Sequence, residues 1–427
     1  MEGRASVLIV GGGIVGTALA WQLAERGVGD VVVVDLDLAG VYASSELNAG
    51  GARATWWQRV NVETCRVTLD LFREHATQLG FREKGYMWLY DDRELLARAR
   101  RFQALQNEQG LGVELLEPGE VAERFPVVDR HLEELVGATF SPRDGLVNPN
   151  AVRQHYRERA EAGGVRFLDR EYVVGVRTAR EVGPAGRLRR VVAVDALRIG
   201  RLDPADDSGR LREILTAHRV PPDLVEGEVR IEADAVVSCL GAWSPLLSAK
   251  LGLPDATLPL RRQLALVDVH REDRAPGVDF EALGMIVDPS GIYYHPEGPH
   301  VLAGFSIPDE PPGYDFDYDG DLFFEEEIWP RLAHRASSFE RCGHVRGWAG
   351  LYAATPDRSG IAGAVPGFAN LFEAHSFTGR GVMQSYGVAR DVAALVDTGR
   401  FEHVDLAPLA RDRFGDPSRL VMEDLHI

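Results

Sequence analysis

Glycines near the start of the chain have the spacing of a phosphate-binding turn. Residues 11–16 read Gly-Gly-Gly-Ile-Val-Gly, a GxGxxG pattern, and follow the apolar run of residues 7–10 without a gap. In such a turn the first glycine permits the tight bend, the second lets backbone approach a pyrophosphate, and the third lets a helix pack on the strand. The helix predicted at residues 14–26 would direct its unpaired N–H groups at the anion.

An acidic residue completes this unit. A second apolar run, residues 31–34, ends at Asp35, which is placed to accept hydrogen bonds from a ribose hydroxyl. An acid at this position would repel a 2′-phosphate, so NADP is disfavoured. The order of strand, helix, strand and acid predicts a dinucleotide site on a βαβ unit. FAD and NAD share this fingerprint, so the segment does not choose between them.

Composition and charge limit the partners of the chain. Its 427 residues are long enough for two or three domains, and its formal net charge of -18 argues against a nucleic acid or an anionic membrane surface. Cys65, Cys239 and Cys342 have neither metal-ligand nor disulfide-framework spacing, so we expect no metal site. We also expect no signal peptide and no membrane span, and hence a cytoplasmic protein. Homo-oligomers are possible.

Later segments combine small residues with an arginine or an aromatic residue. Residues 44–53 (SSELNAGGAR) suit a backbone that passes close to a flat ligand. Residues 235–244 read as a buried strand that ends in Gly-Ala-Trp, and residues 377–383 read FTGRGVM before a predicted helix. A helix N-terminus with Arg380 beside it would stabilise negative charge on a bound ring.

These motifs, with residues 144–149 (DGLVNP) and 355–357 (TPD), resemble in their order the family of FAD-dependent oxidoreductases that includes D-amino acid oxidase, glycine oxidase and sarcosine oxidase. The resemblance covers nearly the whole chain and is closest to the sarcosine oxidase β-subunit and related proteins. It implies an α/β protein (α+β overall) with a Rossmann-like FAD-binding domain and a discontinuous second domain built on a largely antiparallel sheet. The implied boundaries are residues 1–85, 142–184, 230–250 and 345–400 for the FAD-binding domain, 86–141 and 251–344 for the substrate domain, 185–229 for an insertion and 401–427 for a C-terminal tail.

The resemblance also implies the residues that hold FAD. They lie in the glycine turn, after the second strand, in the small-residue segment, at Val174, after the Gly-Ala-Trp strand and in the late loop. The expected set is Gly11, Gly13, Ile14, Val15, Gly16, Asp35, Ser44, Ser45, Gly50, Gly51, Ala52, Arg53, Val174, Gly241, Trp243, Gly379, Arg380, Gly381, Val382 and Met383.

The implied reaction is oxidation of the carbon–nitrogen bond of a small secondary amine or amino acid, by hydride transfer to flavin N5 and hydrolysis of the imine. Tyr294 matches a tyrosine that lines the substrate pocket of sarcosine oxidases, and His375 is a candidate proton acceptor. Arg53 and Arg380 are expected to face the flavin or a substrate carboxylate. Further candidates are Arg59 and Arg261 for the carboxylate and His295 as a second histidine.

Three departures from the family pattern shape the prediction. Gly350 stands where sarcosine oxidases carry a cysteine bonded to FAD, so noncovalent FAD is expected. Leu302 stands where they carry an oxygen-activating lysine, which favours a dehydrogenase that passes electrons to a quinone or protein over an oxidase that uses oxygen. Met383 replaces a lysine on the substrate carboxylate. A noncatalytic FAD-binding assembly protein and an NAD-dependent dehydrogenase remain as alternatives.

Overall fold

A largely parallel sheet forms around the first strand of the chain. The computed structural model describes residues 2–183, 186–200 and 206–425. Strand β1 (Glu2–Val10) pairs in parallel with β2 (Val31–Val34) and β11 (Val225–Ser238). On one side, β8 (Arg166–Leu168) pairs with β2. On the other side, β18 (Leu371–His375) pairs in parallel with β11, and β17 (Ile361–Ala364) pairs antiparallel with β18. The predicted βαβ unit is therefore confirmed as the centre of this sheet.

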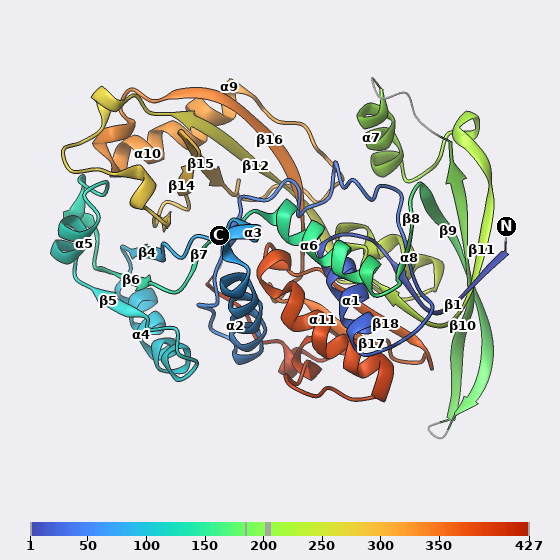
Figure 1. Ribbon diagram of the computed structural model, residues 1–427. Helices are drawn as coiled ribbons and strands as arrows, with labels where there is room; N and C mark the ends of the chain where they lie inside the picture. The colour runs from blue at the N-terminus through green and yellow to red at the C-terminus, as the bar shows by residue number, and fades with distance from the viewer. Residues whose placement is uncertain (1, 184–185, 201–205, 426–427) are drawn as a thin grey trace.

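Helices cover one face of this sheet. The packed group consists of α1 (Ile14–Glu25), α2 (Arg59–Glu74), α6 (Pro149–Ala162) and α11 (Gly381–Thr398), which lie side by side in Figure 1. Their apolar side chains form one core with β1 and β2 because a parallel sheet must bury its faces. The short α3 (Ala76–Leu79) and α8 (Ser244–Lys250) complete this half of the molecule.

A long antiparallel ribbon extends the sheet beyond β11. Strands β9 (Glu171–Gly183) and β10 (Gly186–Ile199) pair with each other, and β10 pairs with β11. Figure 1 shows this ribbon projecting at the right-hand side, with α7 (Asp207–Ala217) near its upper end. The segment 185–229, expected to be a separate insertion, thus supplies a strand and a helix to the first half. Residues 184–185 and 201–205 lie outside the described part.

The second sheet is almost entirely antiparallel, as expected. Its order is β16 (Gly343–Ala354), β12 (Leu258–Asp268), β15 (His300–Phe305), β14 (Tyr293–Glu297), β13 (Met285–Val287), β4 (Tyr86–Tyr90), β6 (Gly137–Ser141) and β5 (Glu114–Leu116). The β13–β4 pair alone is parallel among the described strand pairs of this sheet. Because β16 pairs with β12, the start of the segment 345–400 belongs to this sheet rather than to the first. A two-stranded sheet pairs β3 (Gly51–Ala52) with β7 (Gly145–Leu146), two segments where the chain passes from one half of the molecule to the other.

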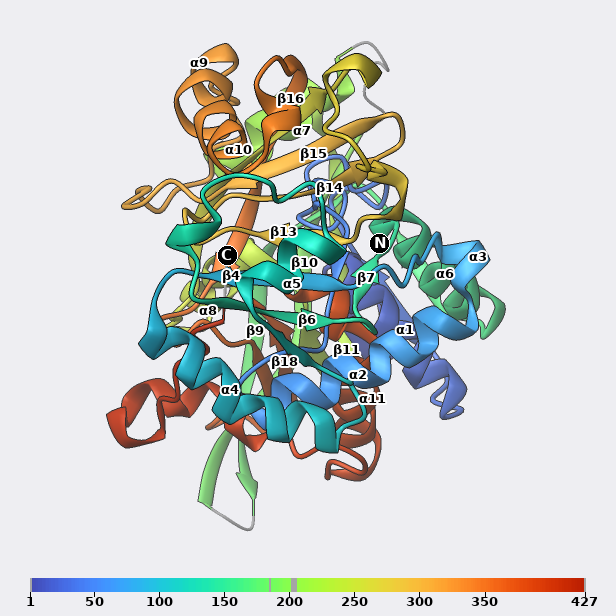
Figure 2. The ribbon, with the colours of Figure 1, turned by 90° about the vertical axis from the view of Figure 1, so that its left-hand side faces the viewer.

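Helices flank the second sheet as well. Figure 2 shows α4 (Arg93–Glu108) below the sheet and, above it, α9 (Asp321–Phe323) and α10 (Trp329–Arg335), which are joined by one π-helical turn, residues 324–328. The remaining short helix α5 (Pro118–Arg124) leads to the 3-10 turn Leu132–Glu134. Buried residues on α5, α9, α10 and the adjoining strands form a second core, whereas Ala99 of α4 belongs to a separate apolar group.

The segment after residue 400 is packed against the rest of the chain, not free of it. Arg413, 1% exposed, donates to the Asp357 carboxylate over 2.7 Å. Glu423 is fully buried and accepts from the backbone N–H groups of Trp57 and Gln58, at the start of α2. The expected C-terminal tail is therefore part of the core between the two halves.

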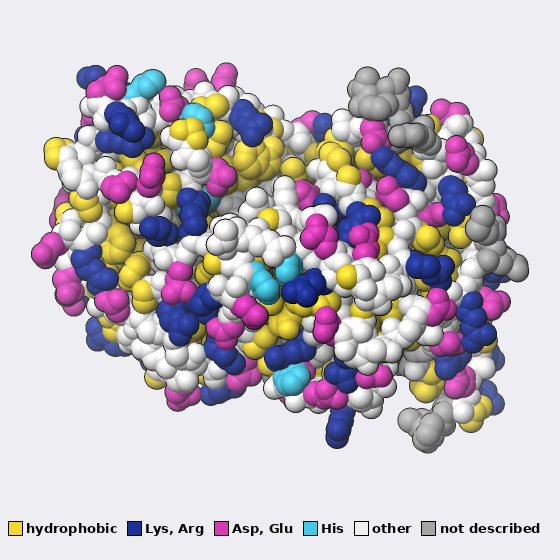
Figure 3. Space-filling view, in the orientation of Figure 1, with side chains coloured by type: hydrophobic (Ala, Val, Ile, Leu, Met, Phe, Trp, Pro, Cys, Tyr) yellow, Lys and Arg dark blue, Asp and Glu magenta, His cyan; other side chains and the backbone are white. Residues whose placement is uncertain are grey.

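Charged side chains of both signs lie on the surface of the molecule. Figure 3 shows basic and acidic side chains interspersed over one face, with no continuous basic region. None of the helices in the described ranges is long and apolar enough to cross a membrane.

Candidate cofactor and substrate site

An elongated cavity runs along the carboxyl ends of β1, β2 and β11. It is lined by most of the predicted cofactor-binding residues and by His375. The predicted residues on its wall are Gly11, Gly13, Ile14, Val15, Asp35, Ser44, Ser45, Gly241, Trp243, Gly379, Gly381 and Val382. Parallel sheets bind ligands at this edge, where strands end and helices begin.

The glycines of the first turn have different steric roles. A Cβ added to Gly11, which has φ 109°, would lie 2.5 Å from the Cys239 carbonyl oxygen, and one added to Gly16 would lie 1.9 Å from the Gly11 carbonyl oxygen. These two positions allow the turn and the packing of α1 on the strand. A Cβ added to Gly13 would meet nothing within 4 Å, although Gly13 lines the cavity. Gly13 therefore keeps open the space that a pyrophosphate needs, and the residues fit a dinucleotide.

The start of α1 is suited to an anion. Gly13 is its N-cap and provides no side-chain hydrogen bond to the first turn, so the positive end of the helix faces the cavity uncapped. Asp35 closes the next part of the wall: its carboxylate accepts from Gly12 N over 2.5 Å and from Asp37 N over 2.8 Å. Burial raises the pKa of Asp35 to about 6. Ionised Asp35 keeps acceptor capacity for a ribose hydroxyl.

Several wall residues were missed in the sequence. The cavity is also lined by Tyr42, Val173, Leu215, Lys250 and Tyr352. Leu215 comes from α7, and its carbonyl accepts from Trp243 Nε1 over 3.1 Å, which ties that helix to the cavity. No local motif marks these residues, because each reaches the wall through long-range packing.

His375 lies on the cavity wall, but its ring is already engaged. Its Nδ1 is 2.7 Å from Ser376 Oγ, and its Nε2 is 3.2 Å from the Glu373 carboxylate, which also binds Arg411. The histidine is fully enclosed, at 2% exposed. This arrangement holds the wall in place and leaves no ring nitrogen free for a substrate proton.

A second group of polar side chains adjoins the cavity at Tyr352. We call it the arginine–tyrosine cluster; it consists of Arg53, Arg262, Arg380, Tyr86, Tyr293 and Tyr352. Its members come from the segment directly after β3, from β4, β12, β14 and β16, and from the loop before α11. The charges of the three arginines act on the hydroxyl groups of the neighbouring tyrosines, and the hydroxyl groups of Tyr293 and Tyr352 interact directly. The cluster brings together residues up to about 330 positions apart in sequence only because the two sheets meet here.

Two buried guanidinium groups dominate the charge of this cluster. Arg53 and Arg380 are 2% and 1% exposed, and their Cζ atoms lie 3.4 Å and 4.6 Å from the centroid of the same Trp56 ring. Arg53 donates to the carbonyl oxygens of Thr55 and Leu425 over 2.9 Å and 2.7 Å. Arg380 Nη2 donates to the Arg358 carbonyl, whereas its Nε and Nη1 have no hydrogen-bond partner among the described residues.

Burial shifts the titration of the cluster in a consistent way. It lowers the pKa of Arg53 to about 10 and lowers the pKa of Arg380, but both remain cationic at neutral pH. Burial also raises the pKa values of the Tyr86, Tyr293 and Tyr352 hydroxyl groups, which therefore stay protonated and can donate. The cluster offers cations and hydrogen-bond donors, the groups that recognise a carboxylate.

Two predicted residues lie one position away from the residue that faces the site. Tyr294 is on the opposite face of the second sheet, where its ring packs against Phe339 at 5.2 Å and its hydroxyl has no partner among the described residues; Tyr293 faces the cluster. Val174 is 36% exposed, and Val173 lines the cavity. The expectations for Tyr294 and Val174 are corrected accordingly, because side chains alternate between the faces of a strand.

The alternation separates two neighbouring arginines as well. Arg261 is engaged by Glu310 and Asp319 over 2.8 Å and 2.9 Å, at the outer side of β12. Arg262 lies with its Cζ 5.5 Å from the Tyr352 ring centroid. Arg59, another carboxylate candidate, is 57% exposed in its side chain and pairs with Glu63 and Glu108. Neither Arg59 nor Arg261 joins the cluster.

The remaining predicted residues serve the framework around the site. A Cβ at Gly50 would lie 2.6 Å from the Val147 carbonyl oxygen, and one at Gly51 would lie 1.9 Å from the Tyr86 hydroxyl. Ala52 and Met383 are buried in the core of the first half, and Gly16 packs as described. His295 Nε2 is 2.6 Å from the Ala49 carbonyl oxygen and so joins the second sheet to the small-residue segment.

Comparisons with known proteins agree with this geometry. The family model described as FAD dependent oxidoreductase matches residues 6–395. The chain is 28% identical to FAD-dependent oxidoreductase domain-containing protein 1 of Xenopus laevis, over 99% of this chain and 85% of that protein. It is 25% identical to monomeric sarcosine oxidase of a Bacillus species, over 94% and 95% of the two chains. Its fold is similar to that of L-proline dehydrogenase from P. horikoshii, with a TM-score of 0.78, 21% identity and coverage of 98% and 99%.

Proposed function

The chain belongs to the family of FAD-dependent oxidoreductases, and we propose that it oxidises the carbon–nitrogen bond of a small secondary amine or amino acid. FAD is its cofactor, which sets aside the alternative of an NAD-dependent dehydrogenase. When bound, FAD accepts the hydride that leaves the substrate carbon. The protein must then position the substrate, hold its charge and exclude water, and these tasks belong to the chain's own residues.

The observation that carries this proposal is the pair of buried guanidinium groups beside the cofactor cavity. A buried cation without a full set of acceptors is unfavourable, and Arg380, 1% exposed, has no partner for Nε and Nη1 among the residues that the structure describes. A substrate carboxylate would supply those acceptors in a bidentate pair. Gly379 and Gly381, on either side of Arg380, line the cofactor cavity, so a carboxylate held here would keep the adjacent carbon next to the cofactor.

The tyrosines support the same orientation. Tyr352 lines the cavity, Tyr293 interacts with Tyr352 from within the cluster, and both remain protonated donors. Donors on one side and cations on the other would fix a carboxylate-bearing amine at two points. Relatives of the chain include proteins named sarcosine dehydrogenase and monomeric sarcosine oxidase, and these names give a substrate of the class proposed here.

Noncovalent FAD is supported by the absence of a suitable thiolate. A Cβ added to Gly350 would lie 2.8 Å from Leu47 Cβ, so a cysteine there would need rearrangement. Burial raises the pKa values of Cys65 and Cys239, which keeps them as unreactive thiols, and raises that of Cys342 to about 12.

A dehydrogenase is supported over an oxidase by the surroundings of Leu302. Its side chain is 3% exposed and packs with Tyr293 in the apolar group that adjoins the arginine–tyrosine cluster. The chain's two lysines do not provide a cation there, since Lys84 is exposed on the surface and Lys250 lines the nucleotide part of the cavity. Without a lysine at this point, we expect slow reaction with oxygen and transfer of electrons to a quinone or protein.

The test is anaerobic reduction of the flavin in the purified protein. We expect a flavin spectrum whose pigment is released by acid, bleaching with a pool of N-methyl amino acids or secondary amino acids, and reoxidation faster by a quinone than by oxygen. The variant Arg380→Met should keep the flavin and lose the bleaching. A flavin that stays oxidised with every amine and amino acid pool would overturn the proposal and favour a noncatalytic FAD-binding protein.

A further inference from the structure

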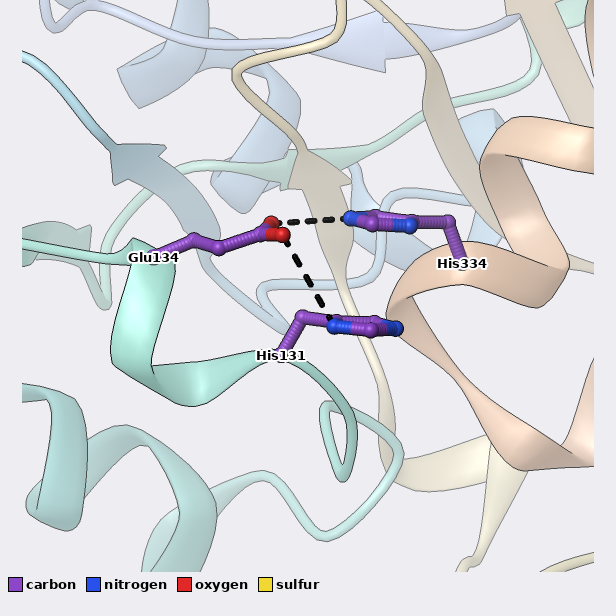
Figure 4. A group of neighbouring side chains, drawn as sticks. All are labelled: His131, Glu134 and His334. Carbon is purple, nitrogen blue, oxygen red and sulfur yellow. Dashed lines mark hydrogen bonds and ion pairs between the residues drawn. The ribbon is translucent and has the colours of Figure 1, made fainter.

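Two histidines and a glutamate gather on the second half of the molecule, away from the cofactor cavity. His131 directly precedes the 3-10 turn Leu132–Glu134, Glu134 ends it, and His334 belongs to α10. The Glu134 carboxylate lies 2.8 Å from His334 Nε2 and 3.7 Å from His131 Nδ1. Figure 4 shows both rings turning a nitrogen-bearing edge toward the carboxylate, with the rings stacked at 4.1 Å and 2° apart in plane.

A buried arginine fixes the two elements that carry these side chains. Arg335, 3% exposed, follows His334 in α10, and its Nε donates to the Asp288 carboxylate over 2.6 Å. Its Nη1 donates to the carbonyl oxygens of Arg130 and His131 over 3.0 Å and 2.6 Å. In return, Arg130 N donates to the Arg335 carbonyl over 3.2 Å. The loop that holds His131, at φ 50°, is therefore tied to α10 from both sides.

We propose that His131, Glu134 and His334 bind a zinc ion that links the 3-10 turn to α10. Zinc binds imidazole nitrogen and carboxylate oxygen at about 2.0–2.2 Å, so tetrahedral ligand atoms lie roughly 3.3–3.6 Å apart. The contacts of 2.8 Å and 3.7 Å from the carboxylate bracket this separation, and the three ligand atoms all lie within 4.8 Å of one another. Rotation of these exposed side chains would bring the ligand atoms to the required separation.

Ligand type and local charge favour zinc over calcium or magnesium. Two imidazoles suit zinc and other late first-row divalent ions, whereas calcium and magnesium prefer sites made of oxygen alone. The Arg335 guanidinium, 3.4 Å from Glu134, is neutralised by its ion pair with Asp288. Glu133 Oε1 is 3.6 Å from His131 Nδ1 but is not among the three ligand atoms that lie within 4.8 Å of one another, so water would take the fourth position.

The site is remote from the reaction and is expected to act on stability. Neither His131, Glu134 nor His334 lines the cofactor cavity. A ligand that binds only the folded state stabilises it in proportion to the logarithm of its concentration over its dissociation constant. Zinc should therefore raise the melting temperature without changing the flavin spectrum.

The experiment measures zinc binding to the FAD-loaded protein by calorimetry, with the melting temperature as a second readout. We expect about one zinc per chain, a higher melting temperature with zinc chloride than with magnesium chloride, and reversal by a chelator. His334→Ala and Glu134→Gln should each weaken binding at least about tenfold, since loss of even an outer-shell partner has that effect. Because both side chains are exposed, these variants should fold.

A surface histidine beside another carboxylate gives the matched control. His270 Nδ1 lies 3.7 Å from the Asp268 carboxylate. Among the described residues, this pair does not belong to a set of three ligand atoms as close together as those of the proposed site. His270→Ala should leave the zinc affinity unchanged. No zinc binding by the unmodified protein, or equal affinity in His334→Ala and His270→Ala, would overturn the proposal.

Discussion

The two ends of the site are built in different ways. At the nucleotide end, the glycine turn, the start of α1 and Asp35 all lie within residues 11–45, and the glycines there have assigned steric roles. At the arginine–tyrosine cluster, the wall comes from long side chains on six elements that span residues 53–380. A backbone-built site follows from a local pattern, whereas a side-chain-built site depends on which face of each strand meets the other half of the molecule.

The largest predicted effect tests the backbone-built end. Gly13→Ala should leave the melting temperature of the FAD-free protein unchanged but weaken FAD binding about 100-fold, near 2.7 kcal/mol, because its Cβ would enter the open space of the cavity. Gly11→Ala should instead destabilise the fold by about 3 kcal/mol, since φ is 109° and the Cβ would contact the Cys239 carbonyl.

Flavin titration and thermal unfolding distinguish these two outcomes. Gly29→Ala is the control, because its Cβ would also meet nothing within 4 Å but Gly29 does not line the cavity. If Gly13→Ala bound FAD as tightly as Gly29→Ala, the assignment of this space to the pyrophosphate would be wrong.

The next effect tests the charge of the arginine–tyrosine cluster. Arg380→Met should retain FAD and lower kcat/KM about 10²–10³-fold, the loss typical of a removed electrostatic contact in a catalytic site. Arg59→Met should change kcat/KM little, because Arg59 is exposed and paired on the surface. Steady-state kinetics with a quinone acceptor measure both variants, and similar losses in the two would count against a specific role for Arg380.

A pair of adjacent tyrosines tests the strand alternation directly. Tyr293→Phe should lower kcat/KM about tenfold, near 1.4 kcal/mol, because it removes one donor from the cluster. Tyr294→Phe should be neutral in kinetics and neutral or slightly stabilising in thermal unfolding, since its hydroxyl is buried without a partner in the described structure. The reverse order of effects would restore the original prediction for Tyr294.

The smallest effect is a pH dependence at the nucleotide end. Burial raises the pKa of Asp35 to about 6, so the carboxylate is ionised above that pH and protonated below it. The ribose contact requires the ionised acceptor; FAD affinity should therefore fall as the pH drops through about 6, by at most about tenfold per pH unit. Asp35→Asn should bind FAD more weakly at pH 7.5 and show little change from pH 7.5 to 5.5. If FAD affinity depended on pH in Asp35→Asn as it does in the unmodified protein, this role of Asp35 would be contradicted.

The near misses in the sequence analysis share one physical cause. Tyr294, Val174 and Arg261 were chosen on the correct strands, but the site is faced by Tyr293, Val173 and Arg262. A strand reverses the direction of its side chains at each residue, and a buried strand is apolar on both faces. A motif can therefore locate the strand without indicating which of two neighbouring residues faces the ligand.

The sequence by itself determined the βαβ unit and, through the family resemblance, the cofactor class. The apolar run 31–34 has the bounds of β2, and the helix predicted at residues 14–26 corresponds to α1, Ile14–Glu25. These features depend on short-range periodicity and on backbone conformations that glycine alone permits without strain.

Only the tertiary structure decided the substrate end and the proposed zinc site. Glu423 and Leu425 reach the site from a segment with no motif, and α7 adds Leu215 to the cofactor cavity from an expected insertion. Glu134 and His334 lie 200 residues apart, so no ligand spacing in the sequence could reveal them. Such contacts are set by the packing of whole elements, because their energies depend on which faces are buried together and not on neighbours in the chain.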